Sequence, residues 1–533
     1  MNKKTLYGSE ARAKVLEGVK KISAAVKVTL GGAGRNVLIA QSAVIDYGVH
    51  NLPIEVSKDG YRVTQRFDLD DPFEKVGVLM IKEAAQKTVD QAGDATTSTV
   101  VLAEAIITEG IKLIDAGMNP MELKKGIDKG VECVVEELRK SSVAIKGDIE
   151  KIRQIATVSA NNDEEIGNLI ADAFSKIGDE GVIDIEASRS VNTEIKISDG
   201  YKFDKGWVSP LFINNKEKQI CEFIDPLILL YEKRVTHHTQ VERALTLAMQ
   251  KGKPILIICE DADEEGLAFL AMNTIQKRIQ CCVVKSPSFG DLRREEMEDI
   301  ATLTGGTYIS DSKGVGVKEI EIENFGSAKK VIISKEETVI IGGNADAESF
   351  TDLINELRMN LTQAKNEDEK FPIEKRIARL TGGVAVIQVG AATETAMKEK
   401  LDRVDDAVRA TKAAIAEGYV VGGGIALLRI NPLTKVEPNE TEGFRAGVKL
   451  IISILSEPFK QICVNAGADK DKCLENVLRG TYNDGYNAKT GKIEDLLKAG
   501  IIDPVKALRC ALQNAASSAT MILTSEAMIV DTL

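Results

Sequence analysis

Hydrophobic residues recur every three or four positions through most of both ends of the chain. Val15, Val19, Ile22 and Val26 keep this spacing before the glycine-rich turn at 31–34. Such spacing is typical of amphipathic helices. It also predicts further helices at about 71–92, 97–116 and 120–140 and through most of the chain after residue 390. The two ends are therefore expected to be helical, interrupted early by β-like stretches at 36–40 and 52–56 and a turn at 57–60.

The pattern changes near residue 180 and keeps its new form to about 345. Apolar β-type runs that begin at Pro226, Pro254 and Cys281 alternate with amphipathic segments. This alternation indicates an α/β region. The amphipathic segments predict helices at 239–250, 264–278 and 291–303, followed by a charged helical stretch at 350–370. The simplest arrangement is one helical domain built from both termini with the α/β region inserted into it.

Composition excludes several classes of protein. The 533 residues carry 69 basic and 81 acidic side chains, a formal net charge of −12, which argues against a nucleic-acid binder. No apolar run approaches the ~18–20 residues of a membrane span, and no secretory signal is visible at the N-terminus. The eight cysteines include no CxxC pair, so we expect reduced thiols in a cytoplasmic protein without nucleic-acid or membrane partners.

Two segments have the composition of a phosphate site. The segment 93–99 (GDATTST) opens a predicted helix, and combines an aspartate with hydroxyl groups and free backbone N–H groups, as phosphate with Mg²⁺ requires. A helix cap with a threonine-rich first turn is an equal alternative. The turn 29–36 (TLGGAGRN) permits close backbone approach to a ligand, but a plain helix end explains it as well.

Isolated charged residues add weaker candidates. Asp59, Asp405 and Asp406 could each orient a water for attack on a γ-phosphate, although solvated surface carboxylates are the commoner case. The adjacent pair His237 and His238 precedes a predicted helix, and a solvated helix start is favoured over a metal site. No Walker A segment, GxGxxG turn after a strand or HExxH sequence is present.

Ordered segments along nearly the whole chain, from about Gly8 to Asp531, share the pattern of one family. They include 29–36, 57–60, 92–98, 106–110, 117–121, 159–161, 289–291, 299–306, 390–394, 403–407, 422–424, 485–487 and 503–504. Through them the sequence resembles a group I chaperonin, the bacterial GroEL type. The resemblance implies a multi-domain α and α/β fold that cycles with ATP, Mg²⁺ and K⁺.

The same resemblance implies three domains. An all-helical equatorial domain that binds ATP and makes ring contacts would span 1–141 and 417–533. A small α/β intermediate hinge domain would span 142–198 and 385–416, and an α/β apical domain for clients and a cap would span 199–384.

Site residues follow from the family pattern position by position. The resemblance assigns Asp406 to activation of the attacking water, Asp59 to support of hydrolysis and Asp94 to Mg²⁺. It places K⁺ at Thr29, Lys58 and Thr97. The remaining nucleotide contacts would come from Leu30, Gly31, Gly32, Ala95, Thr96, Ser98, Gly423, Asn487, Ala488 and Asp503.

Apolar apical side chains would bind non-native proteins. A flexible apolar surface can hold many sequences, because burial of apolar area is non-directional. The matching positions are Trp207, Leu211, Phe212, Leu245, Leu267, Ala271 and Met272. Partners implied by the resemblance are further copies of the chain, in one or two rings of seven, non-native clients and a GroES-like co-chaperonin. Without the resemblance, the apolar stripes of 239–250 and 264–278 would be interpreted as facing a core.

Several positions depart from the family pattern. Gly32–Ala33 replaces a proline and a basic residue. Ala95 replaces a glycine; if the φ at this position is positive, the Cβ of the alanine costs about 1 kcal/mol. About eight extra residues lie around 44–52, where family members reach the neighbouring subunit. Glu242 stands where the apical groove is usually apolar, and the sequence ends without a Gly-Met-rich tail.

The sequence therefore predicts an ATP-dependent chaperonin that captures non-native proteins and promotes their folding in a ring cavity. The alternative is a ring-forming holdase or scaffold with weak or uncoupled ATPase activity, favoured by the altered turn, Glu242 and the absent tail. A small-molecule kinase lacks any recognisable acceptor motif.

Overall fold

A computed structural model of the chain divides into two compact units. Unit 1 comprises residues 1–172 and 391–533, and unit 2 comprises residues 173–390. The structure describes residues 2–532 except 41, 46–47, 52–53, 146, 161–162, 179–180, 189, 217, 311–315, 318, 365–366 and 431–439.

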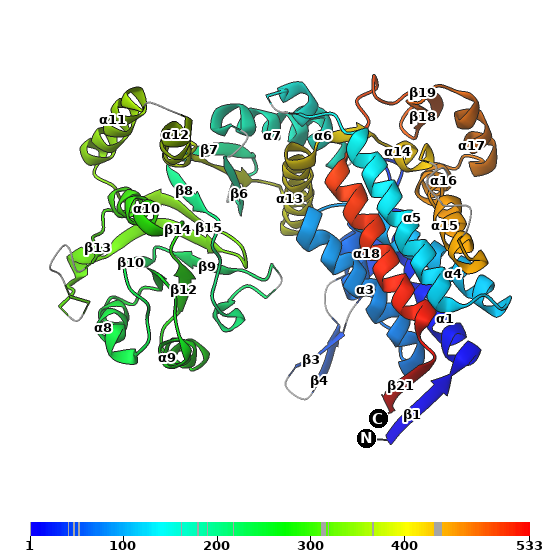
Figure 1. The fold of residues 1–533 in the computed structure, drawn as a ribbon, viewed down its shortest axis with the longest axis horizontal. Coiled ribbons are helices and arrows are strands. Elements are labelled where there is room, and N and C mark those ends of the chain that lie inside the picture. Colours follow the sequence, from blue (N-terminus) through cyan, green and yellow to red (C-terminus); the bar gives the residue numbers. More distant parts are fainter. Residues whose placement is uncertain are drawn as a thin grey trace. The chain divides into compact units, whose positions relative to one another are not determined.

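Unit 1 is a helical domain made from both ends of the chain (Figure 1). Its last long helix, α18 (Val505–Thr524), is buried along most of its length and packs against α3, α4 and α5. Its helices are α1 (Gly8–Val26), α2 (Gly60–Arg66), α3 (Pro72–Ala92), α4 (Thr96–Asp115), α5 (Pro120–Lys140), α6 (Ile149–Ser159), α13 (Glu394–Glu417), α14 (Ile425–Leu428), α15 (Glu442–Ile454), α16 (Glu457–Asn465), α17 (Lys470–Arg479) and α18. Helix α7 (Glu164–Ile177) crosses the division between the units.

Two terminal strands close unit 1. Strand β1 (Asn2–Tyr7) pairs antiparallel with β21 (Ala527–Thr532), and Leu6 lies opposite Met528. The N- and C-termini therefore lie side by side, as Figure 1 shows. Because this pairing joins the two sequence ends, the helical domain needs both of them to complete its core.

Short antiparallel strand pairs connect the helices of unit 1. They are β2 (Val37–Ile39) with β5 (Glu55–Ser57), β3 (Ser42–Ile45) with β4 (Gly48–Asn51), β17 (Tyr419–Val421) with β20 (Ile502–Pro504), and β18 (Asp484–Asn487) with β19 (Lys492–Asp495). The β3–β4 hairpin falls in the insertion expected at 44–52, of which residues 46–47 and 52 lie outside the described part of the chain.

Unit 2 is built around an eight-stranded mixed sheet in the order β12-β11-β10-β14-β15-β8, with β13 added beside β10 and β9 beside β14. Strands β10, β11 and β12 are parallel and wholly apolar apart from one exposed end residue, as expected for strands covered on both faces. The sheet consists of β8 (Gly200–Phe203), β9 (Cys221–Ile224), β10 (Leu227–Tyr231), β11 (Ile255–Cys259), β12 (Cys281–Lys285), β13 (Tyr308–Ile309), β14 (Gly326–Ile333) and β15 (Thr338–Gly343).

Helices and a second sheet complete unit 2. The helices are α8 (Glu242–Lys251), α9 (Glu264–Ile275), α10 (Gly290–Thr304), α11 (Ala347–Gln363) and α12 (Glu367–Thr381). A three-stranded sheet joins β6 (Val182–Ala187), β16 (Val384–Val389) and β7 (Glu194–Ser198) in that order. Val182 and Val384 share a small core with Val339 of β15, so this sheet packs on the larger one within unit 2.

The expected helical ends and α/β middle are confirmed. Helix α5 has the expected bounds, and α3, α4 and α8 to α10 differ from expectation by a few residues. The short helix α2 was missed, because its seven residues offer too little periodicity to stand out from the preceding turn. None of the described helices combines the length and apolar character needed to cross a membrane. The division into three domains stays a prediction.

Candidate functional site

The turn after α1 folds back on itself through its glycines. Thr29 is buried, and its Oγ1 donates a 2.9 Å hydrogen bond to the carbonyl oxygen of Val26. Gly31 has a φ of +80°, and a Cβ on Gly34 would lie only 2.0 Å from the carbonyl oxygen of Thr29. Such closeness is possible only for glycine. The backbone here can consequently approach a ligand without interference from side chains.

A second turn, between α3 and α4, carries Asp94. The backbone N–H of Ala95 donates to one oxygen of Asp94, and the Ser159 hydroxyl donates to the other over 2.7 Å. Ala95 itself adopts a φ of +68°. The φ at residue 95 is therefore positive, as the substitution of a glycine at this position had suggested it could be. The alanine carries the strain of a left-handed backbone, about 1 kcal/mol.

Helix α4 begins without a side-chain cap. Ala95 occupies its N-cap position and makes no side-chain hydrogen bond. The first N–H groups of a helix have no partner within the helix, and their partial positive charge attracts anions. Thr96, Thr97 and Ser98 occupy this first turn, so backbone donors and hydroxyl groups lie together beside Asp94.

The start of α2 packs directly against these two turns. Asp59 caps α2 by accepting hydrogen bonds from the backbone N–H groups of Tyr61 and Arg62, 2.8 and 3.1 Å long. A Cβ on Gly60 would lie 1.9 Å from Oγ1 of Thr97, which itself lies 3.2 Å from Oγ1 of Thr29. Thus Thr29, Thr97 and the Asp59 cap, which are far apart in sequence, form one compact site.

Helix α13 brings a further carboxylate to the same place. The Ser159 hydroxyl lies 3.4 Å from the carbonyl oxygen of Asp406 while also binding Asp94. Burial raises the pKa of Asp406 well above its ordinary value, and the charges of Asp59 and Asp94 raise it further. The pKa of Asp59 is likewise raised, mainly by burial and in part by Asp94. These carboxylates therefore repel one another in a poorly solvated site.

Asp503 lies on β20, in the strand pair β17–β20. It lies across from Val420 in the β17–β20 pairing, and Gly422 leaves room beside its carboxylate. Burial raises the pKa of Asp503 to about 7, with a contribution from Asp94, although the backbone N–H of Gly423 opposes the shift. Asp503 is therefore close enough to Asp94 for their charges to interact, and Gly423 lies beside Asp503.

The β18–β19 hairpin contributes Asn487 and Ala488 less directly. The Asn487 amide donates to Glu494 over 2.6 Å, and its oxygen accepts from the backbone N–H of Lys489. Leu496 lies against both Gly423 and Gly485, so this side chain connects the hairpin to the turn that holds Asp503. No described contact joins Asn487 to the carboxylate group itself.

The donor set suits a cation bound together with a phosphate. Like-charged buried carboxylates with raised pKa values are stabilised by a nearby cation. Among the described residues, no three His, Cys, Asp or Glu side chains are placed to hold a metal by themselves. Mg²⁺ is commonly held by one or two carboxylates plus substrate phosphates, so a shared site fits. Lys58 is the third residue expected at K⁺, and its pKa is lowered by burial and by the charge of Arg403; the K⁺ site stays a prediction.

Leu30 and Gly32 lie in the turn after α1, together with Thr29 and Gly31. The side-chain amide of Asn465 donates to the carbonyl oxygens of Lys27 and Leu30, both over 2.9 Å. Helix α16 therefore supports this turn. Neither Asn465 nor Ser159 was predicted as a site residue, because each lies at the end of a helix and acquires its partner only through tertiary packing.

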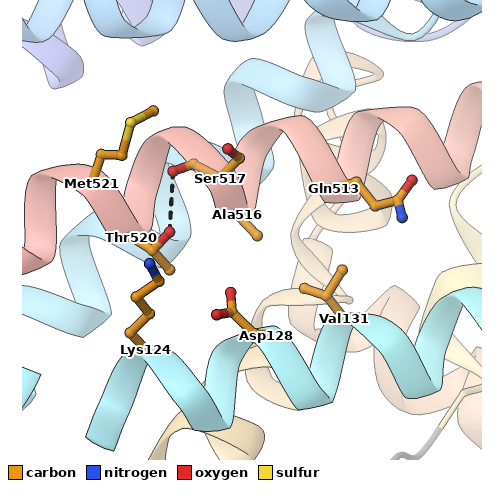
Figure 2. A pocket seen from close by; sticks show the side chains of 8 residues that line it. All are labelled: Lys124, Asp128, Val131, Gln513, Ala516, Ser517, Thr520 and Met521. Carbon is orange, nitrogen blue, oxygen red and sulfur yellow. Dashed lines mark hydrogen bonds between the residues drawn. The ribbon is translucent and has the colours of Figure 1, made fainter. Parts of the chain in front are cut away.

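A separate cavity of about 430 Å³ lies between α5 and α18 (Figure 2). Its lining is Lys124, Asp128, Val131, Gln513, Ala516, Ser517, Thr520 and Met521. None of the expected site residues takes part. The polar group around Asp94, and not this cavity, is therefore the candidate site.

The expected client-binding residues of unit 2 differ in exposure. Leu211 is 53% exposed and Met272 50%, whereas Trp207 and Leu267 are partly buried. Phe212, Leu245 and Ala271 belong to the hydrophobic core of the unit. In this conformation, apolar surface is presented only by Leu211, Met272, Trp207 and Leu267 among these residues. Glu242 is exposed in the first turn of α8.

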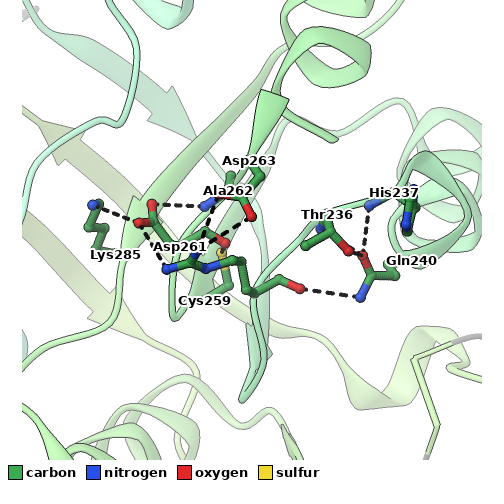
Figure 3. Close-up of polar contacts among 9 residues, drawn as sticks. Thr236, His237, Gln240, Cys259, Asp261, Ala262, Asp263 and Lys285 are labelled. Atoms are coloured by element: carbon green, nitrogen blue, oxygen red, sulfur yellow. Dashed lines mark hydrogen bonds and ion pairs between the residues drawn. The ribbon is translucent and has the colours of Figure 1, made fainter. Parts of the chain in front are cut away.

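Polar contacts fix the loops before α8 and α9. Gln240 accepts hydrogen bonds from the backbone N–H groups of Thr236 and His237, and Asp261 pairs with Lys285 over 2.9 Å (Figure 3). Nδ1 of His237 and Nδ1 of His238 lie 2.8 and 2.9 Å from the two oxygens of Glu265. The histidines are exposed, consistent with the expectation of a solvated helix start.

Comparisons with known proteins agree with this architecture. The model of the TCP-1/cpn60 chaperonin family matches residues 22–532. A crystal structure of the chaperonin gp146 from the bacteriophage EL 2 (Pseudomonas aeruginosa), obtained in the presence of ATP-BeFx, has a similar fold. The similarity has a TM-score of 0.68 at 19% sequence identity and covers 99% of each chain.

Proposed function

Because the chain belongs to the TCP-1/cpn60 chaperonin family, we propose that it is an ATP-dependent chaperonin of the group I type whose site around Asp94 hydrolyses ATP. The observation that carries this proposal is the half-buried, mutually repelling group of Asp59, Asp94 and Asp406 beside the uncapped start of α4. The ATP analogue present with the phage chaperonin supports nucleotide as the ligand.

The phosphates would lie between the two turns. Backbone N–H groups at the start of α4 and the hydroxyls of Thr96, Thr97 and Ser98 would donate to them. The open turn from Thr29 through Leu30 and Gly31 to Gly32 would cover the other side. Mg²⁺ would be held by Asp94 and would neutralise charge on the phosphates. K⁺ would be held by Thr29, Lys58 and Thr97.

The base and ribose would lie toward the C-terminal elements. Gly423, Asn487, Ala488 and Asp503 come from the β17–β20 pair and the β18–β19 hairpin, which Leu496 links. The N–H of Gly423 already donates to Asp503, so the carboxylate is oriented before a nucleotide arrives.

Asp406 would orient the attacking water. Its side chain is half-buried beside Asp59 and Asp94, so an adjacent water would be partly shielded from bulk solvent. A carboxylate with a raised pKa is a better proton acceptor than an ordinary aspartate. Asp59 would add negative charge near the water while its cap on α2 holds it in place.

Unit 2 would capture non-native clients. The exposed residues Leu211 and Met272 and the partly buried Trp207 and Leu267 would offer apolar contact first. Phe212, Leu245 and Ala271 could join only if residues 210–212, α8 and α9 loosen from the core. A homo-oligomeric ring of seven subunits, single or double, and a GroES-like cap complete the proposed cytoplasmic machine.

A holdase or scaffold with weak or uncoupled hydrolysis is the second candidate. The strained Ala95 beside the phosphates and the exposed charge of Glu242 favour it. ATP turnover in the high-mass fraction from size exclusion, with Mg²⁺ and K⁺ supplied, distinguishes the two.

The test compares the parent with Asp406→Ala and with Lys398→Ala, an exposed position at the start of the same helix. We expect turnover to disappear in Asp406→Ala, with nucleotide binding retained, and to persist in Lys398→Ala. A parent that assembles but shows no turnover would favour the holdase.

A further inference from the structure

An ion pair joins helix α13 to helix α2 in unit 1. The guanidinium of Arg62 on α2 reaches both carboxylate oxygens of Asp402 on α13, with Nη2 3.2 Å from Oδ1 and Nη1 3.2 Å from Oδ2. A contact at two points between a planar guanidinium and a carboxylate fixes direction as well as distance. The pair therefore defines how this part of α13 lies against α2, although the two residues are 340 positions apart.

Each end of the pair adjoins a carboxylate of the candidate site. The backbone N–H of Arg62 donates a 3.1 Å hydrogen bond to Oδ2 of Asp59. Asp402 precedes Asp406 by four residues, so the two lie about one turn apart on the same face of α13. The charge of Asp59 acts on the pKa of Asp402 and on that of Asp406. The ion pair thus links the two helices at the carboxylates that hydrolysis would use.

The surroundings favour a formed pair at neutral pH. Nη1 of Arg62 also donates to Oε1 of Glu55 on β5, 3.0 Å away, which restrains the guanidinium. Burial raises the pKa of Asp402 to about 6, and the charge of Arg62 opposes that shift. The carboxyl of Asp402 is consequently mostly ionised at pH 7, and both charges of the pair are present.

A second contact holds α13 beyond Asp406. Arg409 packs so closely on the turn before α4 that a Cβ added to Gly93 would lie 2.3 Å from the Cβ of Arg409. Gly93 directly precedes Asp94 in that turn. Asp406 therefore lies between two attachments of its helix, one through Arg409 and one through Asp402.

We propose that Arg62 and Asp402 are positioning residues, which hold α13 against α2 and thereby place Asp406 for the attack of water on the γ-phosphate. The positioning role rests on the proposed ATPase function of this site, whereas the ion pair does not. The two side chains are 34% and 31% exposed, and pairs at such positions contribute little to stability. Loss of the pair should consequently misplace Asp406 without unfolding the domain. A misplacement of about 1 Å can lower an enzymatic rate ~100-fold.

Steady-state ATP hydrolysis and equilibrium ATP binding by the full chain test the role. We expect Arg62→Ala and Asp402→Asn each to lower kcat about tenfold. The Kd for ATP should change by less than about twofold, because neither side chain is placed among the phosphate donors. The double variant should lose no more than either single variant, since all three lack the same interaction. Asp402→Glu, which keeps a carboxylate within reach of Arg62, should recover most of kcat.

Arg66→Ala is the matched control. Arg66 lies one turn after Arg62 on α2, and its Nε is 3.6 Å from Glu55. Among the residues that the structure describes, Arg66 forms no ion pair with α13, so we expect this variant to keep the kcat of the parent. Thermal midpoints of all variants should stay within about 3 °C of the parent, which separates misplacement from unfolding.

Two results would overturn the positioning role in a parent that hydrolyses ATP. One is an unchanged kcat in both single variants, and the other is losses that multiply in the double variant. Failure of Asp402→Glu to recover any activity would also count against the role. A parent that binds ATP but shows no turnover would instead refute the proposed function and the positioning role with it, while the thermal midpoints of the single and double variants would still report whether Arg62 and Asp402 interact.

Discussion

The hydroxyl of Ser159 donates a 2.7 Å hydrogen bond to Oδ2 of Asp94. Ser159 is the last residue of α6, and Asp94 lies in the turn before α4, so the bond joins elements 65 positions apart. The same hydroxyl lies 3.4 Å from the backbone carbonyl of Asp406. One side chain thereby orients the proposed Mg²⁺ ligand and lies beside the helix that carries the proposed catalytic carboxylate.

Removal of this hydroxyl should loosen Asp94. We expect Ser159→Ala to lower the free energy of unfolding by about 1–2 kcal/mol, because the carboxylate loses a charge-assisted bond. The Mg²⁺ concentration needed for half-maximal nucleotide binding should rise several-fold, which a Mg²⁺ titration of binding measures. The matched control is Ser349→Ala in unit 2, where an exposed hydroxyl donates to Asp346 over 2.9 Å. An equal shift in that control would contradict the prediction.

The strain at Ala95 should be relieved by glycine. Because φ is +68° there, Ala95→Gly removes a steric penalty of about 1 kcal/mol, partly offset by the greater freedom of glycine in the unfolded chain. We expect the thermal midpoint to stay equal or to rise. Ala105→Gly, in the interior of the same helix, should instead lower stability by about 1 kcal/mol. Thermal unfolding of both variants checks the difference, which would disappear if residue 95 were not left-handed.

The raised pKa of Asp503 predicts a pH dependence. In the unfolded chain this carboxyl ionises near pH ~4, whereas in the folded protein its pKa is about 7. Ionisation is thus easier in the unfolded state, so the contribution of Asp503 to stability is greatest below about pH 4 and falls as the pH rises to about 7. A displacement of a pKa by one pH unit corresponds to about 1.4 kcal/mol.

Asp503→Asn should remove this fall. The gain in thermal midpoint over the parent, measured without nucleotide or Mg²⁺, should therefore grow between about pH 5 and pH 8. Asp495→Asn is the control with the opposite sign, since the backbone N–H of Lys498 lowers the pKa of Asp495. A gain independent of pH would contradict the raised pKa of Asp503 in the folded protein.

Core and surface positions near η2 (Pro210–Phe212) should respond differently to truncation. Phe212→Ala removes a fully buried ring and should destabilise unit 2 by about 3–5 kcal/mol. Leu211→Ala should change stability by under about 1 kcal/mol, because Leu211 is exposed, yet it should weaken capture of an unfolded test protein. Unfolding curves and a capture assay test the pair. Loss of capture in Phe212→Ala without loss of stability would contradict the core assignment.

Much of the fold follows from local sequence. The three- and four-residue spacing predicted α1, α3, α4 and α5, because each long helix buries one face and exposes another. The apolar runs of β10, β11 and β12 likewise predicted the strands of an α/β region. The short strand pairs β17–β20 and β18–β19 were not predicted, since each strand has only three or four residues and depends on a partner for its conformation.

The candidate site was predicted only as separate pieces. The sequence by itself determined that an aspartate precedes a hydroxyl-rich helix start and that glycines follow Thr29. It could not determine that Gly60 packs on Thr97, that Ser159 reaches Asp94 or that Asp406 lies half-buried near the charges of Asp59 and Asp94. Those relationships arise when α2, α6 and α13 converge on the start of α4. Burial and proximity decide the charge state of a carboxylate, and both are properties of the packed chain, whereas local periodicity needs no more than the neighbours along a single helix or strand.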